Sequence, residues 1–247
     1  LFYLVLGAFL PLREFGFINW AKSWSQLPYN LTVQNVIAIT FPAYSRLQHD
    51  KKLLTRAIEK TVYFISISVF PLLAGMAIFV IPFTTLLVKY QKWQPALFTF
   101  ALFTLSIGWA AVSTPLTNTL SAIGQVNKTV RLMIMWTILT WVLTPICIWI
   151  WGFNGVAIAA FLISFTSLIP IYMVKKIVPV QIVAQVKDSL LATLGMSILG
   201  IWGLQIWKIS LPHMFGGILL CVVVYGLILL FVRKEKLLKE VRSLLQK

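Results

Sequence analysis

Long apolar stretches recur along this 247-residue chain at intervals of about 30 residues, separated by short connections that carry charges, glycine or proline. Hydrophobic residues make up 60% of the sequence, charged residues make up 11%, and the mean hydropathy is +0.91. Soluble domains carry about 25% charged residues. A stretch of about 20 apolar residues crosses a bilayer as an α-helix. The sequence therefore predicts an all-α, polytopic transmembrane helical bundle.

About eight spans are expected, of which the first is partial. Residues 1–11 are too few to span and lack the features of a signal peptide, so we expect the chain to begin inside a helix of a longer protein. The residues after Val232 are predicted to form a basic amphipathic helix, because leucines and Val241 recur there at helical spacing. The full spans are predicted at residues 15–44, 57–88, 95–123, 129–151, 155–174, 189–207 and 214–232.

The basic residues are distributed unequally between the two sides of this predicted topology. Sixteen of the 21 Lys and Arg fall on one set of alternate connections, and four (Arg13, Lys89, Lys92 and Lys208) fall on the other. Cytoplasmic loops carry such an excess. The C-terminus of this cell-membrane protein is therefore predicted to be cytoplasmic. The net charge of +15 is explained by topology and by contacts with membrane lipids, and predicts no nucleic-acid partner.

The span at residues 15–44 is unusually polar. Steps of three and four residues keep its polar side chains on one helical face, which cannot face lipid. Pro28 predicts a kink within this span. The face either lines a hydrated cavity, bonds to neighbouring helices or lies at the membrane surface. The polar residues of the span are Asn19, Lys22, Ser23, Gln26, Asn30, Gln34 and Asn35, and the steps of three and four run from Asn19 through Lys22, Gln26 and Asn30 to Gln34.

Lys22 favours the cavity, because a buried ammonium group needs an anionic partner and the predicted spans contain no carboxylate. The alternative is that its side chain extends to the nearby outer end of the span. A weaker polar stripe around Pro115, in the span 95–123, indicates either a second wall of a transport path or close helix packing. Its members are Ser106, Ser113, Thr114, Thr117, Asn118 and Ser121.

Catalytic chemistry has no support in the sequence. The acidic residues fall at predicted loops or span ends, and His49 and His213 are predicted on opposite sides of the membrane. Cys147 and Cys221 lie in apolar runs and are expected to be inert, buried thiols. We therefore expect a protein that is not an enzyme, with no catalytic residue, metal site or cofactor. The acidic residues are Glu14, Asp50, Glu59, Asp188, Glu235 and Glu240.

Several short motifs together resemble those of a transporter family. The run Phe41-Pro42-Ala43-Tyr44-Ser45-Arg46-Leu47 is similar to a stretch in polysaccharide-repeat-unit flippases, which belong to the multidrug/oligosaccharidyl-lipid/polysaccharide exporter superfamily. Further similarities lie at residues 15–21, 92–96, 122–125 and 152–157, so that the resemblance covers roughly residues 1–175.

The resemblance implies a fourteen-helix transporter, of which this chain supplies helices seven to fourteen. Residues 1–175 would form its C-terminal six-helix bundle with the first helix truncated, residues 176–232 two trailing helices, and residues 233–247 the basic tail. The implied partners are the N-terminal bundle and polysaccharide polymerase machinery. The implied function is flipping of an undecaprenyl-pyrophosphate-linked oligosaccharide through a cationic, polar cavity that opens to each side in turn.

In such a cavity, Lys22 and Arg13 would attract the pyrophosphate or acidic sugars, and amide side chains would bond sugar hydroxyls. The full set of expected cavity residues is Lys22, Asn19, Ser23, Gln26, Asn30, Gln34, Arg13, Thr114 and Asn118. The alternatives are a small-molecule antiporter of the same superfamily, a polytopic membrane enzyme of polysaccharide assembly, and a structural subunit that does not transport. Lipid II or teichuronic-type precursors are alternative cargoes.

Overall fold

The structure, a computed structural model, describes the backbone of residues 10–245 and the side chains of residues 10–232. This described part consists of helices joined by short connections, without a β-strand. The prediction of an all-α fold is therefore confirmed. The partial first helix predicted at residues 1–11 lies almost wholly outside the described residues, and so do the side chains of the basic tail.

Most of the helices are α-helical, with one π-helical segment (η1) and three short 3-10 segments (η2, η3 and η4) at bends and ends. The elements are α2 (Leu12–Tyr29), η1 (Asn30–Gln34), α3 (Asn35–Arg46), α4 (Lys51–Leu86), η2 (Val88–Ala96), α5 (Leu97–Ala122), α6 (Val126–Trp151), η3 (Gly152–Asn154), α7 (Gly155–Ser164), η4 (Phe165–Ser167), α8 (Leu168–Ile177), α9 (Ile182–Trp202), α10 (Leu204–Trp207) and α11 (Leu211–Leu245).

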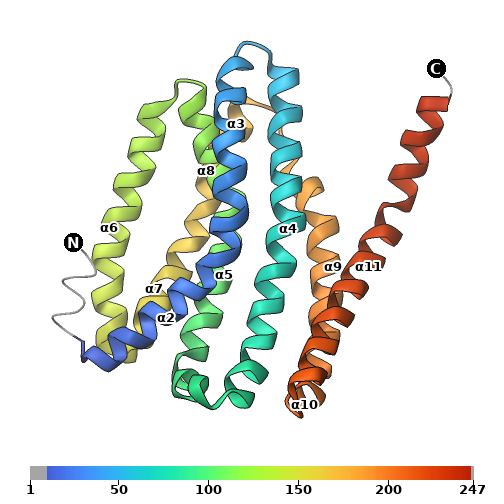
Figure 1. Ribbon diagram of the computed structural model, residues 1–247. Helices are drawn as coiled ribbons and strands as arrows, with labels where there is room; N and C mark the ends of the chain where they lie inside the picture. The colour runs from blue at the N-terminus through green and yellow to red at the C-terminus, as the bar shows by residue number, and fades with distance from the viewer. Residues whose placement is uncertain (1–9, 246–247) are drawn as a thin grey trace.

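Five helical stretches of the described chain are long and apolar enough to cross a membrane. One of them, Val126–Ile177, turns back at Gly152, whose φ of 59° is a conformation that favours glycine. This stretch therefore folds into a hairpin of α6 with α7 and α8 (Figure 1). The continuous segment from α2 to α3 is not among the five, because its polar residues lower its hydropathy. The protein is a multi-pass membrane protein.

The long helices stand side by side in a bundle with two distinct ends (Figure 1). α4 packs against α5 on one side and against α9 and α11 on the other, and α2 runs obliquely across the bundle before it continues into α3. The connections at residues 47–50, 123–125 and 178–181 lie at one end, which we call the basic end. Segments η2, η3 and α10 lie at the other, which we call the opposite end.

Apolar side chains fill the contact between α4 and α5. Ile58 and Val62 of α4 and Leu116 and Leu120 of α5 are fully buried in one cluster near the basic end. Because lipid is as apolar as these side chains, close packing rather than hydrophobic burial stabilises such contacts in a membrane. The many exposed apolar residues of α6, α9 and α11 are accordingly typical of surfaces that face lipid.

Helices α9 and α11 are bonded to α4 next to a proline. Pro71 has no N–H, so the carbonyl of Ile67 lacks its helical donor. The hydroxyl of Tyr225 on α11 donates to this carbonyl at 2.8 Å, and the hydroxyl of Ser189 on α9 donates to the carbonyl of Ser66 at 2.7 Å. A carbonyl that proline leaves free in the membrane is thus satisfied by a neighbouring helix.

Asp188 lies inside a helix and is buried. The sequence places the start of its span at Ser189, but α9 begins at Ile182, because apolar residues continue the helix before the charged pair of Lys187 and Asp188. Asp188 is consequently in the second turn of α9 and is only 6% exposed. One of the six acidic residues is therefore buried within the bundle.

Candidate functional site

The polar residues of α2 and η1 lie on the side of this helix that the rest of the described bundle leaves uncovered. We call these six residues the polar face. Asn19, Ser23, Asn30 and Gln34 are exposed, whereas Lys22 and Gln26 are partly buried.

The other side of the same helix packs into the bundle. Ile18 and Ala21 are fully buried in a cluster with Phe100 of α5, and Val33 is fully buried in a cluster with Ile65 of α4. Within the described chain, the exposed residues of the polar face therefore do not join one helix to another. A hydrated cavity and a location at the membrane surface remain as explanations of these residues.

Two amides of the polar face are held together. The side-chain nitrogen of Gln34 donates to the side-chain oxygen of Asn30 at 3.2 Å, one turn away along the helix. This bond uses one N–H donor of the Gln34 side chain. The side-chain oxygen of Gln34 and the side-chain nitrogen of Asn30 can still bond to other groups. The pair thus presents both a donor and an acceptor, which is the combination that a hydroxyl group requires.

The predicted kink is present and is extended by a π-helical turn. Pro28 ends the regular bonding of α2, and η1 follows from Asn30 to Gln34. The hydroxyl of Thr32 donates to the carbonyl of Pro28. π-helical turns occur frequently at functional sites. Above this bend the chain turns from the oblique direction of α2 to that of α3 (Figure 1).

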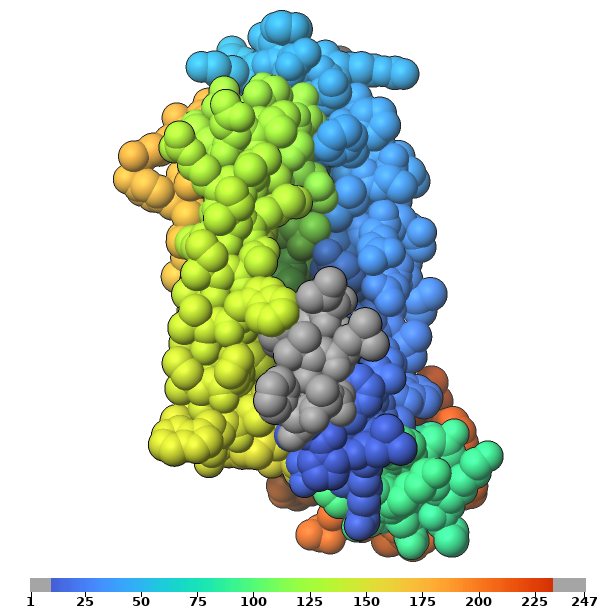
Figure 2. Space-filling model, turned by 90° about the vertical axis from the view of Figure 1, so that its left-hand side faces the viewer, coloured from blue at the N-terminus to red at the C-terminus, as the bar shows by residue number. Residues whose placement is uncertain are grey.

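The weaker stripe on α5 serves largely to pack helices. Ser106 donates to the carbonyl of Ala160 at 3.2 Å, and Ser121 donates to the hydroxyl of Thr129 at 3.0 Å. Both bonds join α5 to another helix, as the packing interpretation predicts. Figure 2 shows α5 recessed between α6 and α3.

Thr114 and Asn118 of this stripe are partly buried. Thr114 is brought to the polar segment, because the hydroxyl of Tyr29 on α2 donates to Thr114 Oγ1 at 3.1 Å. Tyr29 was not among the predicted site residues. Its position next to Pro28 is the one signal in the sequence that would have indicated a role in fixing the bend.

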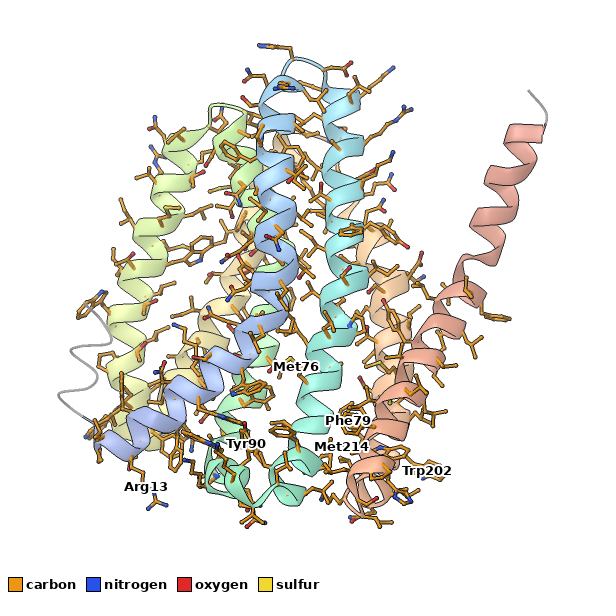
Figure 3. The ribbon with its side chains drawn as sticks, viewed as in Figure 1. Arg13, Met76, Phe79, Tyr90, Trp202 and Met214 are labelled. Carbon is orange, nitrogen blue, oxygen red and sulfur yellow. The ribbon has the colours of Figure 1, made fainter. Side chains whose placement is uncertain are left out.

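Arg13 lies apart from the polar face. It is exposed on the first turn of α2, at the opposite end of the bundle, and in Figure 3 it points away from the other helices. Its guanidinium group lies 5.7 Å from the centre of the Phe17 ring. The structure thus does not bring Arg13 together with Asn30 and Gln34.

An apolar pocket of about 150 Å³ lies near the opposite end. Figure 3 shows three of its residues, Met76 and Phe79 of α4 and Met214 of α11, close to one another. The sequence does not predict this pocket, because its residues come from four helices. Its lining residues are Trp20, Trp24, Met76, Phe79, Val80, Phe83, Phe100, Met214 and Ile218.

The described residues contain no group of three or more His, Cys, Asp or Glu that could hold a metal ion. His49 follows α3 at the basic end, and His213 lies in the first turn of α11 at the opposite end. What the described site offers is a set of amides, hydroxyls and one ammonium group, which can form hydrogen bonds with a polar anionic molecule.

Comparisons with known proteins agree with the fold. Residues 1–98 match the model of the family described as "Polysaccharide biosynthesis protein". A solved structure titled "Lipid II flippase MurJ, inward closed conformation" matches with a TM-score of 0.70 and 14% sequence identity, over 91% of this chain. The resemblance to polysaccharide-biosynthesis proteins is thus confirmed over residues 1–98, and the fold of a known flippase is shared by most of the chain.

At 14% identity the likeness to the solved structure is one of fold. The chain spans about half of that protein, since the match covers 48% of its length. Among curated proteins, none matches the sequence significantly.

Proposed function

We propose that this chain forms one half of a transporter that flips an undecaprenyl-pyrophosphate-linked oligosaccharide across the cytoplasmic membrane for the synthesis of a cell-surface polysaccharide. The family match over residues 1–98 and the fold shared with a lipid II flippase support the flipping of a lipid-linked substrate. The transport activity is proposed for the full-length protein and not for this chain alone.

The observation that carries this proposal is the uncovered polar face. Polar groups at membrane depth are costly unless they meet water or polar partners. Asn19, Ser23, Asn30 and Gln34 are exposed on the described bundle. We infer that they line one wall of a hydrated cavity, and that an N-terminal bundle provides the facing wall.

Each part of the cargo has a matching group on this wall. The ammonium group of Lys22 attracts the pyrophosphate or an acidic sugar, because charge-assisted hydrogen bonds are about twice as strong as neutral ones. The amides of Gln26, Asn30 and Gln34 exchange hydrogen bonds with sugar hydroxyls. No covalent step is involved, so that the protein acts as a transporter and not as an enzyme.

The orientation follows from the charges at the two ends. Exposed cations, among them Arg46, Lys51, Arg56, Arg131 and Lys175, gather at the basic end. The excess of positive charge indicates that this end is cytoplasmic. We therefore propose that the C-terminus is cytoplasmic and that polysaccharide polymerase machinery receives the cargo on the other side.

The experiment that tests this function follows the glycan in cells. The gene for the full-length protein is depleted and then restored, and a membrane-impermeant reagent that oxidises sugars is applied from outside. On depletion, the undecaprenyl-linked glycan is expected to accumulate protected from the reagent, and restoration is expected to make it accessible.

Three outcomes contradict the proposal. Failure of the glycan to form on depletion indicates an enzyme of polysaccharide assembly. Normal accessibility with accumulation of protected lipid II indicates a different lipid-linked cargo. Normal accessibility of both excludes lipid-linked glycans and favours the antiporter.

A further inference from the structure

Three of the four cations at the opposite end of the bundle lie in one region. Arg13 lies on the first turn of α2, Lys89 and Lys92 lie on η2, and Lys208 follows α10. Because α2 and η2 pack against each other, three of these four cations belong to one region. The distribution of charge that sets topology disfavours cations on the outer side. Cations that lie together there in spite of this are candidates for binding an anion.

Aromatic rings hold two of these cations in place. The guanidinium group of Arg13 lies 5.7 Å from the centre of the Phe17 ring, and the ammonium group of Lys92 lies 5.2 Å from the Trp93 ring. The rings of Phe17 and Trp93 contact each other edge to face, with centres 6.1 Å apart. We call Arg13, Phe17, Trp93 and Lys92 the ring series. Cation–π contacts restrain the long side chains, which lowers the entropy lost when an anion binds them.

The charges of the ring series are available to a ligand. Arg13 and Lys92 are both exposed, and among the side chains that the structure describes neither forms an ion pair. The acidic residue of the same turn of α2, Glu14, is partly buried. Two restrained cations that form no ion pair suit a group with two negative charges, such as a phosphate or diphosphate.

The apolar pocket adjoins the ring series through Trp20. The indole rings of Trp20 and Trp93 are stacked, with centres 5.4 Å apart and an angle of 7° between their planes. Trp20 also lines the pocket, together with Met76, Phe79 and Met214. At about 150 Å³ the pocket has the size that holds a benzene-sized apolar group, and it is too small for an oligosaccharide.

We propose that the ring series and the pocket form a binding site for a lipid with a phosphate headgroup in the leaflet at the opposite end of the bundle. Arg13 and Lys92 bind the phosphate, and the pocket takes the first apolar part of the hydrocarbon chain. The indoles of Trp93 and Trp20 connect the polar and apolar parts of the site. This site is separate from the polar face, and occupancy of it does not require transport.

Binding to the purified full-length protein in dodecyl maltoside, a detergent without phosphate, tests this site. The probe is farnesyl diphosphate, which combines a diphosphate with a short apolar chain, and its two halves are inorganic pyrophosphate and farnesol. Farnesyl diphosphate is expected to bind at least tenfold more tightly than either half. Arg13→Gln and Lys92→Gln are each expected to weaken its binding about five- to tenfold, whereas Lys92→Arg retains it.

Two further variants separate the head from the chain. Met214→Trp fills the pocket and is expected to weaken binding of farnesyl diphosphate and farnesol alike. Lys208→Gln, a cation of the same end outside the ring series, is the matched control and is expected to change nothing.

Wild-type affinity of the variant with both Arg13→Gln and Lys92→Gln contradicts the proposal. So does binding of pyrophosphate as tight as that of farnesyl diphosphate, which indicates a site for soluble anions. The assay contains no transport step, so its failure leaves the proposed flipping untouched, and failure of flipping leaves this lipid site untouched.

Discussion

The hydroxyl of Tyr29 donates a hydrogen bond to Thr114 Oγ1 across 3.1 Å, and this bond joins the bent polar segment to α5. Thr114 in turn donates to the carbonyl of Ala110 at 2.7 Å, which orients its oxygen to accept from Tyr29. Tyr29 directly follows Pro28 and precedes the π-helical turn. The bond therefore fixes the point at which the helix that carries the polar face changes direction.

Loss of this bond is expected to loosen the bend. Tyr29→Phe and Thr114→Val each remove it, and a double-mutant cycle is expected to give a coupling of about 0.6 kcal/mol, the average for hydrogen bonds between membrane helices. Reversible unfolding in mixed detergent measures the free energy of unfolding of the full-length wild-type protein, of the two single variants and of the double variant. Strictly additive effects would show that the two side chains do not interact.

The bond between Tyr225 and the carbonyl of Ile67 makes a prediction about Pro71. Tyr225→Phe is expected to destabilise the wild-type protein by about 1 kcal/mol, because a carbonyl is left without a donor. Pro71→Ala supplies the missing N–H, so the same substitution should cost clearly less in that background. The measurement is the same unfolding assay. An equal cost in both backgrounds would contradict the account of how α11 is held to α4.

Gly155 is expected to tolerate no side chain. A Cβ built at this position would collide with the backbone of Cys147 at the end of α6, so Gly155→Ala must separate α6 from α7. We expect a loss of about 1–3 kcal/mol of stability. The matched control is Gly216→Ala, where a Cβ meets nothing within 4 Å. Comparable thermal stability of the two variants in detergent would refute the close approach.

The proposed topology predicts the side on which reporters are active. Alkaline phosphatase, which is active only outside the cytoplasm, is expected to be inactive when fused after Lys247 and active when inserted after Tyr90 in η2. A fluorescent protein that matures only in the cytoplasm should give the opposite pattern. Activity of the phosphatase at Lys247 would overturn the proposed orientation.

Helices were the part of the structure that the sequence predicted best, because apolar stretches of a given length permit little else in a membrane. The predicted spans 57–88 and 129–151 correspond to α4 and α6, and Pro28 marks a kink as predicted. The charged pair of Lys187 and Asp188 predicts a span that begins at residue 189, whereas α9 begins at Ile182. Asp188 shows that a single carboxylate can instead lie buried within the helix.

Features made by several helices together were not predictable. The apolar pocket is lined by side chains of α2, α4, α5 and α11. The spacing of residues within one helix does not predict which residues of other helices lie beside them. Charge alone predicts that Arg13 joins Lys22 in the cavity, yet the oblique path of α2 places Arg13 near Phe17 at the end of the bundle. The sequence predicts which face of a helix is polar, whereas the direction of the helix depends on packing.

The most direct test of the central claim is the accessibility of the glycan from outside in cells that carry Lys22 variants of the full-length protein. If Lys22 attracts the anionic part of the cargo, Lys22→Ala should reduce the accessible fraction about tenfold, while Lys22→Arg should retain most of it because the charge is kept. Arg131→Ala, an exposed cation of α6 at the basic end, is the control and should leave transport unchanged. Wild-type accessibility in both Lys22 variants, at equal protein levels, would contradict the claim that the polar face forms the path of the cargo.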